Sequence, residues 1–131
     1  MQYDITHAHI TSMLEAAIKT LDTLRDGNRH TVASAILTED GHIFTGINMY
    51  HFTGGPCAEV SAMSSMLLAN KSNPAAILAI GDLNRGVMSP CGRCRQMLLD
   101  YFPEIQVVIA NDESFSLRSI RELLPDAFSA Q

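Results

Sequence analysis

Four residues of this sequence have side chains that bind metal ions or move protons, and they fall into two short motifs. Cys57 lies two positions before Glu59, and Cys91 and Cys94 form a C-x-x-C pair directly after Pro90. Each motif stands where a loop gives way to a segment with helical character. Exposed backbone N–H groups and the helix dipole at such a position favour a thiolate over a thiol. Thiolates are good zinc ligands, so the pattern predicts that the three sulfurs bind one Zn²⁺ per chain.

The glutamate gives this predicted zinc site a chemical purpose. If the two helices each follow a strand of one sheet, their N-termini can meet, and Cys57, Cys91 and Cys94 can share the metal. Three protein ligands leave one position open, which is typical of catalytic zinc sites, because the metal can then bind a water molecule and lower its pKa. Glu59, in the same first turn as Cys57, is close enough to move protons to and from that water. We therefore predict Glu59 as the catalytic residue.

Two other interpretations of the cysteines are open. A structural zinc site needs a fourth protein ligand, which His51 or a more distant histidine would have to supply. A thioredoxin-like redox pair of Cys91 and Cys94 would leave Cys57 and Glu59 without a role. The combination of the two motifs favours the catalytic zinc site over both.

The segments that must position these residues alternate between helical and strand patterns. Apolar residues recur at helical spacing over residues 10–24, where Ser12 and Glu15 are typical of a capping box. "TVASAIL" and "HIFTGIN" flank the turn signal Asp40-Gly41 and predict an antiparallel hairpin. Among the later segments, three predict helices: "CAEVSAMSSMLLANK", "PCGRCRQMLLDYF" and residues 119–124. Three predict strands: "AAILAIGDL", "IQVVIAN" and the short segment of residues 115–117.

Size and element order together indicate one α/β domain. The chain has 131 residues, of which 47% are hydrophobic, and this is enough to build one sizeable core. We expect a single domain over residues 1–131. The predicted order α-β-β-α-β-α-β-β-α indicates a mixed sheet with helices on both faces.

Composition also excludes several classes of partner. The formal net charge of -5 argues against binding to long nucleic acids, because such binding depends on Lys and Arg neutralising phosphates. The longest apolar run, residues 75–80, is far too short for a membrane span. The N-terminus "MQYDITHAHI" lacks the features of a secretory signal, so we expect a cytoplasmic protein. An odd number of cysteines in that reducing compartment favours metal binding over disulfides.

The motifs match a signature known from zinc nucleobase deaminases, in which a ligand, one residue and a glutamate precede P-C-x-x-C. With "IFTGINMYHFTGGPCAE", "AIGDLNRGVMSPCGRCRQMLLD" and "IRELLP", the chain resembles the cytidine deaminase superfamily, and within it the branch of blasticidin S deaminases, over about residues 31–128. The resemblance implies a three-layer α/β/α sandwich with a mixed five-stranded sheet, and a homotetramer with active sites near its subunit interfaces. It also implies hydrolytic deamination of the cytosine ring of a small nucleoside substrate.

The same resemblance suggests which residues bind substrate. Cytidine deaminases carry an Asn and, two residues on, a Glu that bind the ribose hydroxyls, whereas this chain keeps Asn48 but has Tyr50 in the place of the glutamate. A missing carboxylate removes an acceptor for a hydroxyl group, which disfavours cytidine. We therefore expect the substrate to be blasticidin S or a close cytosine nucleoside analogue, with cytidine or deoxycytidine as the alternative. Phe52 either lines the pocket against the pyrimidine or packs in the loop.

Four more positions carry over from the blasticidin S branch. Thr31 and Arg85 match a serine and an arginine that contact substrate, and Phe128 replaces a tyrosine near the C-terminus. Arg93, between two of the cysteines, either donates hydrogen bonds that draw electron density from the sulfurs or is a solvated surface charge. The tail "DAFSAQ" lacks a tryptophan that fungal members of the blasticidin S branch carry after that tyrosine. We therefore expect activity on blasticidin S that is weaker, or that is replaced by activity on another cytosine derivative. The rival from a different class is a non-catalytic binding protein that keeps the fold and a structural zinc.

Overall fold

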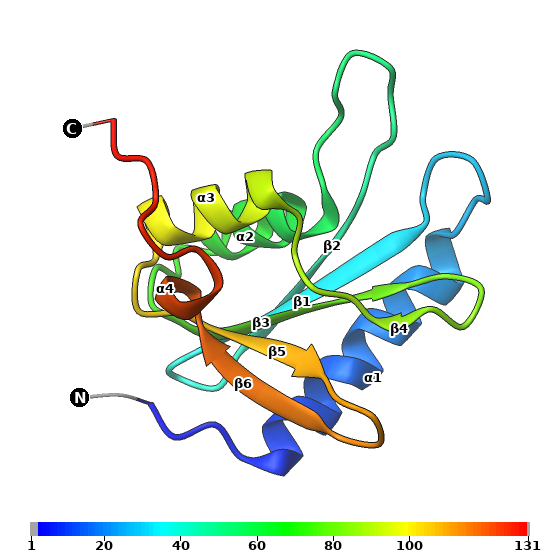
Figure 1. Cartoon of the computed structure of the whole chain (residues 1–131). Helices are drawn as coiled ribbons and strands as arrows, with labels where there is room; N and C mark the ends of the chain where they lie inside the picture. The colour runs from blue at the N-terminus through cyan, green and yellow to red at the C-terminus, as the bar shows by residue number, and fades with distance from the viewer. Residues whose placement is uncertain (1–2, 131) are drawn as a thin grey trace.

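The computed structural model describes residues 3–130 and shows one sheet with helices on both of its faces (Figure 1). Among these residues, no helix is long and apolar enough to cross a membrane. In chain order the elements are α1 (His7–Leu24), β1 (Val32–Thr38), β2 (Ile43–Ile47), α2 (Ala58–Leu68), β3 (Pro74–Gly81), β4 (Gly86–Val87), α3 (Gly92–Tyr101), β5 (Gln106–Ala110), β6 (Phe115–Ser119) and α4 (Ile120–Leu123).

The sheet is mixed, as the sequence predicts. Its strands follow the order β2-β1-β3-β5-β6, and the two-residue strand β4 pairs with β3 beside this path. β3 and β5 run parallel, while β1 and β2, β1 and β3, β3 and β4, and β5 and β6 pair antiparallel. The predicted five strands are therefore present, and β4 is an addition that two residues could not reveal through any periodicity.

The helices divide between the two faces and create two cores. Helix α1 covers one face, where Met13, Ala17 and Leu21 pack in a cluster with Leu78 of β3. Helices α2, α3 and α4 lie over the other face (Figure 1), where Met66 and other apolar side chains cluster around Ile77, Leu98 and Ile120. All eight residues of β3 are buried because this central strand is covered from both sides. The predicted three-layer α/β/α sandwich is confirmed.

Helix α1 begins earlier than its apolar pattern indicates. Its N-cap is Thr6, and Thr6 forms a capping box with His9, whose ring accepts from the Thr6 backbone N–H at 2.9 Å. The predicted capping box of Ser12 and Glu15 is wrong, because both residues lie inside the helix. A histidine in place of the usual Glu or Gln hid the true start.

A glycine sets the distance between the hairpin and the helix that carries two of the site residues. A Cβ added at Gly46 of β2 would lie 2.2 Å from the backbone nitrogen of Ala62 in α2. Backbone atoms cannot give way as a flexible side chain does. Gly46 therefore lets α2 lie directly against β2, which fixes the first turn of α2 above the sheet.

Candidate active site

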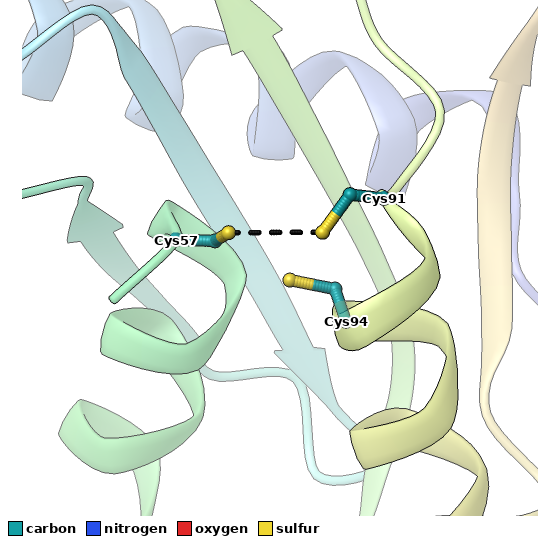
Figure 2. Close-up of side chains that lie close together, drawn as sticks. All are labelled: Cys57, Cys91 and Cys94. Atoms are coloured by element: carbon teal, nitrogen blue, oxygen red, sulfur yellow. Dashed lines mark hydrogen bonds between the residues drawn. The ribbon is translucent and has the colours of Figure 1, made fainter. Parts of the chain in front are cut away.

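The three cysteines come together at the N-termini of two neighbouring helices. Cys57 is the N-cap of α2, Cys91 is the N-cap of α3, and Cys94 lies in the first turn of α3. Figure 2 shows the three side chains pointing toward one another from these two helices. Their sulfur atoms all lie within 4.8 Å of one another, and the Cys57 and Cys91 sulfurs are 3.7 Å apart.

This cluster fits a zinc ion. Two sulfurs that each lie about 2.3 Å from one tetrahedral ion are about 3.8 Å apart, which agrees with the Cys57–Cys91 separation of 3.7 Å. Three soft sulfur donors favour zinc over magnesium or calcium, which prefer oxygen ligands. Within residues 3–130 the cluster contains these three donors and no fourth. The arrangement matches a catalytic rather than a structural site.

Burial and neighbouring negative charge oppose ionisation of the three thiols, so a bound cation would stabilise their thiolate forms. Burial raises the pKa of the Cys94 thiol above its usual range, and the nearby Glu59, Cys57 and Cys91 raise it further. Burial likewise raises the pKa of Cys57. For Cys91, burial acts in the same direction, but backbone N–H groups of Cys94 and Arg93 and the Cys57 thiol outweigh it, so its pKa is lowered. A divalent cation offsets the repulsion that opposes ionisation of all three.

Glu59 is a buried carboxyl next to this cluster. It lies in the first turn of α2 and is 6% exposed. Burial raises its pKa, and hydrogen bonding to its own backbone N–H and to the Cys94 thiol offsets this only in part. A buried carboxyl next to a metal site is suited to take up and release protons.

A cavity of about 360 Å³ opens beside the cluster, and both Glu59 and the sulfur ligands Cys57 and Cys91 line it. This volume is in the range of small-molecule sites. Asn48 and Tyr50 line the cavity as well, so the structure brings these two predicted specificity positions to the same space as Glu59. Met88 and Ser89 also form part of its wall, and sequence reasoning missed them. Their only signal was their position directly before Pro90.

Asn48 uses most of its amide to hold two strands together. Its Oδ1 accepts hydrogen bonds from the backbone N–H groups of Thr31 at 2.7 Å and Val32 at 3.0 Å. Its Nδ2 donates to the Thr31 hydroxyl at 3.1 Å. The two backbone donors fix the orientation of the amide, so one N–H of Nδ2 remains for a ligand in the cavity.

Arg85 and Thr31 do not line the cavity, although Thr31 is hydrogen-bonded to the Asn48 amide that does. The Arg85 Nη2 donates to the Asp82 carboxylate at 2.8 Å and to the Thr31 carbonyl oxygen at 2.9 Å. Asp82 is 8% exposed, so this ion pair is partly buried. Arg85 therefore ties the end of β3 to the start of β1 within this chain.

The two predicted aromatic contacts stand away from the cavity. Phe52 is 87% exposed, and its ring lies tilted against that of His51 with ring centroids 4.5 Å apart. It lies in the arm, residues 48–57, which rises from the end of β2 before the chain enters α2 (Figure 1). Phe128 is 74% exposed, and its backbone oxygen accepts from Gln96. Neither ring lines the cavity.

The two arginines beside the cysteine ligands differ in their surroundings. The Arg93 side chain is exposed, and Arg93 contributes only its backbone N–H to lowering the pKa of Cys91, after the Cys94 N–H and the Cys57 and Cys94 thiols. Arg95 instead donates to the carbonyl oxygens of Pro90 at 2.8 Å and Leu123 at 3.0 Å. Arg95 thereby fixes the segment that precedes Cys91 against the end of α4.

Known proteins with the same features place the chain in a family. The model of the cytidine and deoxycytidylate deaminase zinc-binding region matches residues 7–110. A blasticidin-S deaminase from Bacillus cereus is 30% identical over 122 residues, which cover 86% of this chain and 87% of that protein. A cytidine deaminase from Mycobacterium tuberculosis is 32% identical over 103 residues, covering 77% and 74% of the two chains.

Solved structures agree with this placement. The crystal structure of cytidine deaminase from Burkholderia pseudomallei superimposes with a TM-score of 0.76 at 32% identity, covering 94% of this chain and 99% of that one. The cytidine deaminase of Mycobacterium tuberculosis gives the same TM-score at 26% identity, covering 92% and 97%. The chain belongs to the cytidine and deoxycytidylate deaminase family. It is a zinc-dependent aminohydrolase of the kind that hydrolyses the amino group of cytosine rings.

Proposed function

We propose that this enzyme deaminates the cytosine ring of blasticidin S, or of a close cytosine nucleoside analogue, and so acts in antibiotic resistance. The observation that carries the proposal is the position of Tyr50. It lines the cavity with Glu59 and Asn48, where cytidine deaminases have a carboxylate for the ribose. A phenol cannot supply the charged acceptor that a ribose hydroxyl finds in those enzymes. The 30% identity to a blasticidin-S deaminase over most of the chain supports the same substrate.

The residues of the site account for the reaction. Cys57, Cys91 and Cys94 would hold zinc, which when bound supplies Lewis-acid activation of a water molecule. Glu59 takes a proton from the water and passes it to the ring nitrogen next to the reacting carbon. The water oxygen bonds to the ring carbon, and Glu59 carries the second water proton from the new hydroxyl group to the amino group. The C–N bond then breaks, and the products are a uracil ring and ammonia.

Of the other predicted substrate contacts, Asn48 lines the cavity, whereas Thr31 and Arg85 lie next to Asn48 and outside the cavity wall. Asn48 donates its remaining N–H to the substrate, and Thr31 and Arg85 act next to it, the former through its hydroxyl. We also propose that Arg93 reduces the negative charge on the sulfurs. Phe52 and Phe128 stand exposed on the arm and the C-terminal tail, so they meet substrate only where copies of the chain assemble. This is consistent with the homotetramer that the resemblance implies, formed by single domains of residues 1–131 in the cytoplasm.

Cytidine or deoxycytidine is the second candidate substrate. Asn48, which binds ribose in cytidine deaminases, lines the cavity here as well. Cytidine deaminases also match the chain at 32% identity, slightly above the value for the blasticidin-S deaminase, over a smaller part of it. Identity alone does not separate the two substrates.

A direct assay separates them. The purified, zinc-loaded protein is mixed with blasticidin S and, separately, with cytidine, and the ultraviolet change that accompanies loss of the cytosine amino group is followed. Conversion of blasticidin S but not of cytidine supports the proposal and shows that the altered tail is tolerated. Conversion of cytidine alone makes the second candidate correct. Conversion of neither would contradict the proposal and leave the substrate to be sought among other cytosine derivatives.

A further inference from the structure

His51 lines the same cavity as Glu59, and the reaction described above does not use it. It belongs to the arm and follows Asn48 by three positions. It is not a member of the metal cluster, which within residues 3–130 consists of the three cysteines. Its polar ring is therefore free for another task in the cavity.

Thr53 determines which nitrogen of the His51 ring carries the proton. The backbone N–H of Thr53 donates to Nδ1 of His51 at 3.1 Å, and the Thr53 hydroxyl contacts the same nitrogen. A backbone N–H can only donate, so Nδ1 is an acceptor and the proton of the neutral ring is on Nε2. Among the residues that the structure describes, no group accepts a hydrogen bond from this Nε2–H.

Neighbouring residues also restrain the His51 ring. The His51 carbonyl oxygen accepts from the Gly54 N–H at 2.9 Å, which closes a turn in the arm. The Phe52 ring lies against the imidazole, and Thr53 holds its Nδ1. A donor that is already restrained loses less freedom when it binds a ligand.

Asn48 and His51 offer the cavity donors while their acceptor atoms are engaged. The Oδ1 of Asn48 is used by Thr31 and Val32, and its Nδ2 keeps one N–H. The Nδ1 of His51 is used in the same way, and its Nε2–H is free. A carboxylate needs donors only, whereas a hydroxyl group also needs an acceptor for its own proton. These two side chains therefore favour a carboxylate over a hydroxyl group.

We propose that the Nε2–H of His51 donates a hydrogen bond to a carboxylate on the sugar of the substrate, and so helps to determine specificity. The cytosine ring reacts beside the cysteines and Glu59, which leaves the arm side of the cavity for the sugar. The phenol of Tyr50 carries no negative charge that would repel a carboxylate there. Blasticidin S fits, because its sugar is a uronic acid, and to that extent the inference rests on the proposed function.

Two substitutions separate the donor from the local structure of the arm. In His51→Gln the side-chain amide places an N–H near the position of Nε2, whereas in His51→Asn the shorter amide can accept from Thr53 but cannot reach that position. His7→Asn is the matched control, because His7 is an exposed histidine on α1, which covers the other face of the sheet (Figure 1). The zinc-loaded proteins are assayed with blasticidin S and with its methyl ester, which lacks the negative charge.

The wild type should have a kcat/KM about tenfold or more higher for the acid than for the ester, because a charged acceptor forms the stronger hydrogen bond. His51→Gln and His7→Asn should keep this preference. His51→Asn should lose most of it, through a higher KM for the acid at an unchanged kcat. A His51→Asn protein that keeps the preference overturns the proposal. So does an equal loss on acid and ester, which would show that His51 only supports the arm.

The same measurements distinguish this inference from the proposed function. Conversion of blasticidin S by the wild type tests the proposed function, whereas the preference for acid over ester among the variants tests His51. If the wild type converts only cytidine, the proposed function fails. The variants are then compared on the cytidine analogue that carries a carboxylate in place of its hydroxymethyl group, and on the methyl ester of that analogue, with the same expected and contradicting results.

Discussion

The sulfur atoms of Cys57 and Cys91 lie 3.7 Å apart although the residues are 34 positions apart in the chain. Each residue occupies the N-cap position of the helix that follows it, and both helices pack over the same face of the sheet. The pair therefore exists only when the hairpin, the arm and both helices are in place. A metal that binds this pair stabilises the folded state and not the unfolded chain.

Removal of zinc should therefore lower the melting temperature. A ligand present at about a thousand times its Kd stabilises the folded state by about 4 kcal/mol. We expect one zinc per chain, and a clear drop in Tm when a strong chelator removes it, measured by calorimetry with metal analysis. Cys94→Ser is the control, because a protein that cannot complete the site should show a smaller response to zinc. An identical Tm with and without metal contradicts this prediction.

Replacement of Tyr50 should change the choice of substrate. Tyr50→Glu restores a carboxylate to the cavity wall, and a hydrogen bond to a charged acceptor contributes about 1.5–3 kcal/mol. The ratio of kcat/KM for cytidine to that for blasticidin S should rise by about tenfold to a hundredfold.

The control for this substitution is Tyr50→Gln, which has a similar size to glutamate but no charge. It should move the ratio much less. If Tyr50→Glu leaves the ratio at its wild-type value, Tyr50 does not determine specificity.

Gly46 should tolerate no side chain. In Gly46→Ala the new Cβ would meet the Ala62 backbone nitrogen at 2.2 Å and the Ala58 carbonyl oxygen at 2.6 Å. Overpacking of this kind against backbone atoms should lower the free energy of unfolding by about 3 kcal/mol. Gly27→Ala is the matched control, since no atom lies within 4 Å of a Cβ built there. Urea unfolding measures the stability of both variants. Equal stability of the two would contradict the claim that Gly46 is needed for the close packing of α2 against β2.

Asp40 should make stability depend on pH in the acid range. Its carboxylate accepts hydrogen bonds from Lys71, at 2.7 Å, and from Thr38, and it lies 3.1 Å from the His42 ring. The hydrogen bond from Lys71 is the largest cause, followed by those from Thr38 and His42, and together they hold the pKa of Asp40 below its ordinary 3.8.

A carboxyl whose pKa is lower in the folded state than in the unfolded chain stabilises the protein at every pH above its unfolded pKa. This contribution is lost as the pH falls through the folded-state pKa. Asp40→Asn should therefore be less stable than the wild type near neutral pH, and the difference should shrink between about pH 5 and about pH 2. Urea unfolding across this range measures it. Loss of zinc in acid affects both proteins alike. A difference that stays constant with pH would show that the hydrogen bonds, and not the charge, carry the effect.

The sequence was sufficient to predict the metal cluster and the layers of the fold. Ligand type, spacing and helix starts all pointed to one chemistry for Cys57, Cys91 and Cys94, and the structure brings these three together. The catalytic role of Glu59, which lies beside them, stays a prediction. The strands were predictable because a buried central strand such as β3 is a continuous apolar run.

Features that depend on tertiary contacts were not predictable. The amide of Asn48 is mostly engaged by Thr31 and Val32, and only the folded chain reveals this. Met88 and Ser89 form part of the cavity wall because β4 pairs with β3 directly before them, and a two-residue strand has no sequence pattern. The exposure of Phe52 likewise follows from the path of the arm.

The most direct test of the central claim is the rate of ammonia release by Glu59→Gln, measured beside its zinc content. Glutamine keeps the shape of the buried side chain but cannot carry a proton between water and the ring. The account predicts one zinc per chain, as in the wild type, and a kcat on the preferred cytosine substrate that falls by about a thousandfold. Ammonia release at the wild-type rate by the zinc-loaded variant would contradict the account, because Glu59 would then have no part in the proton transfer.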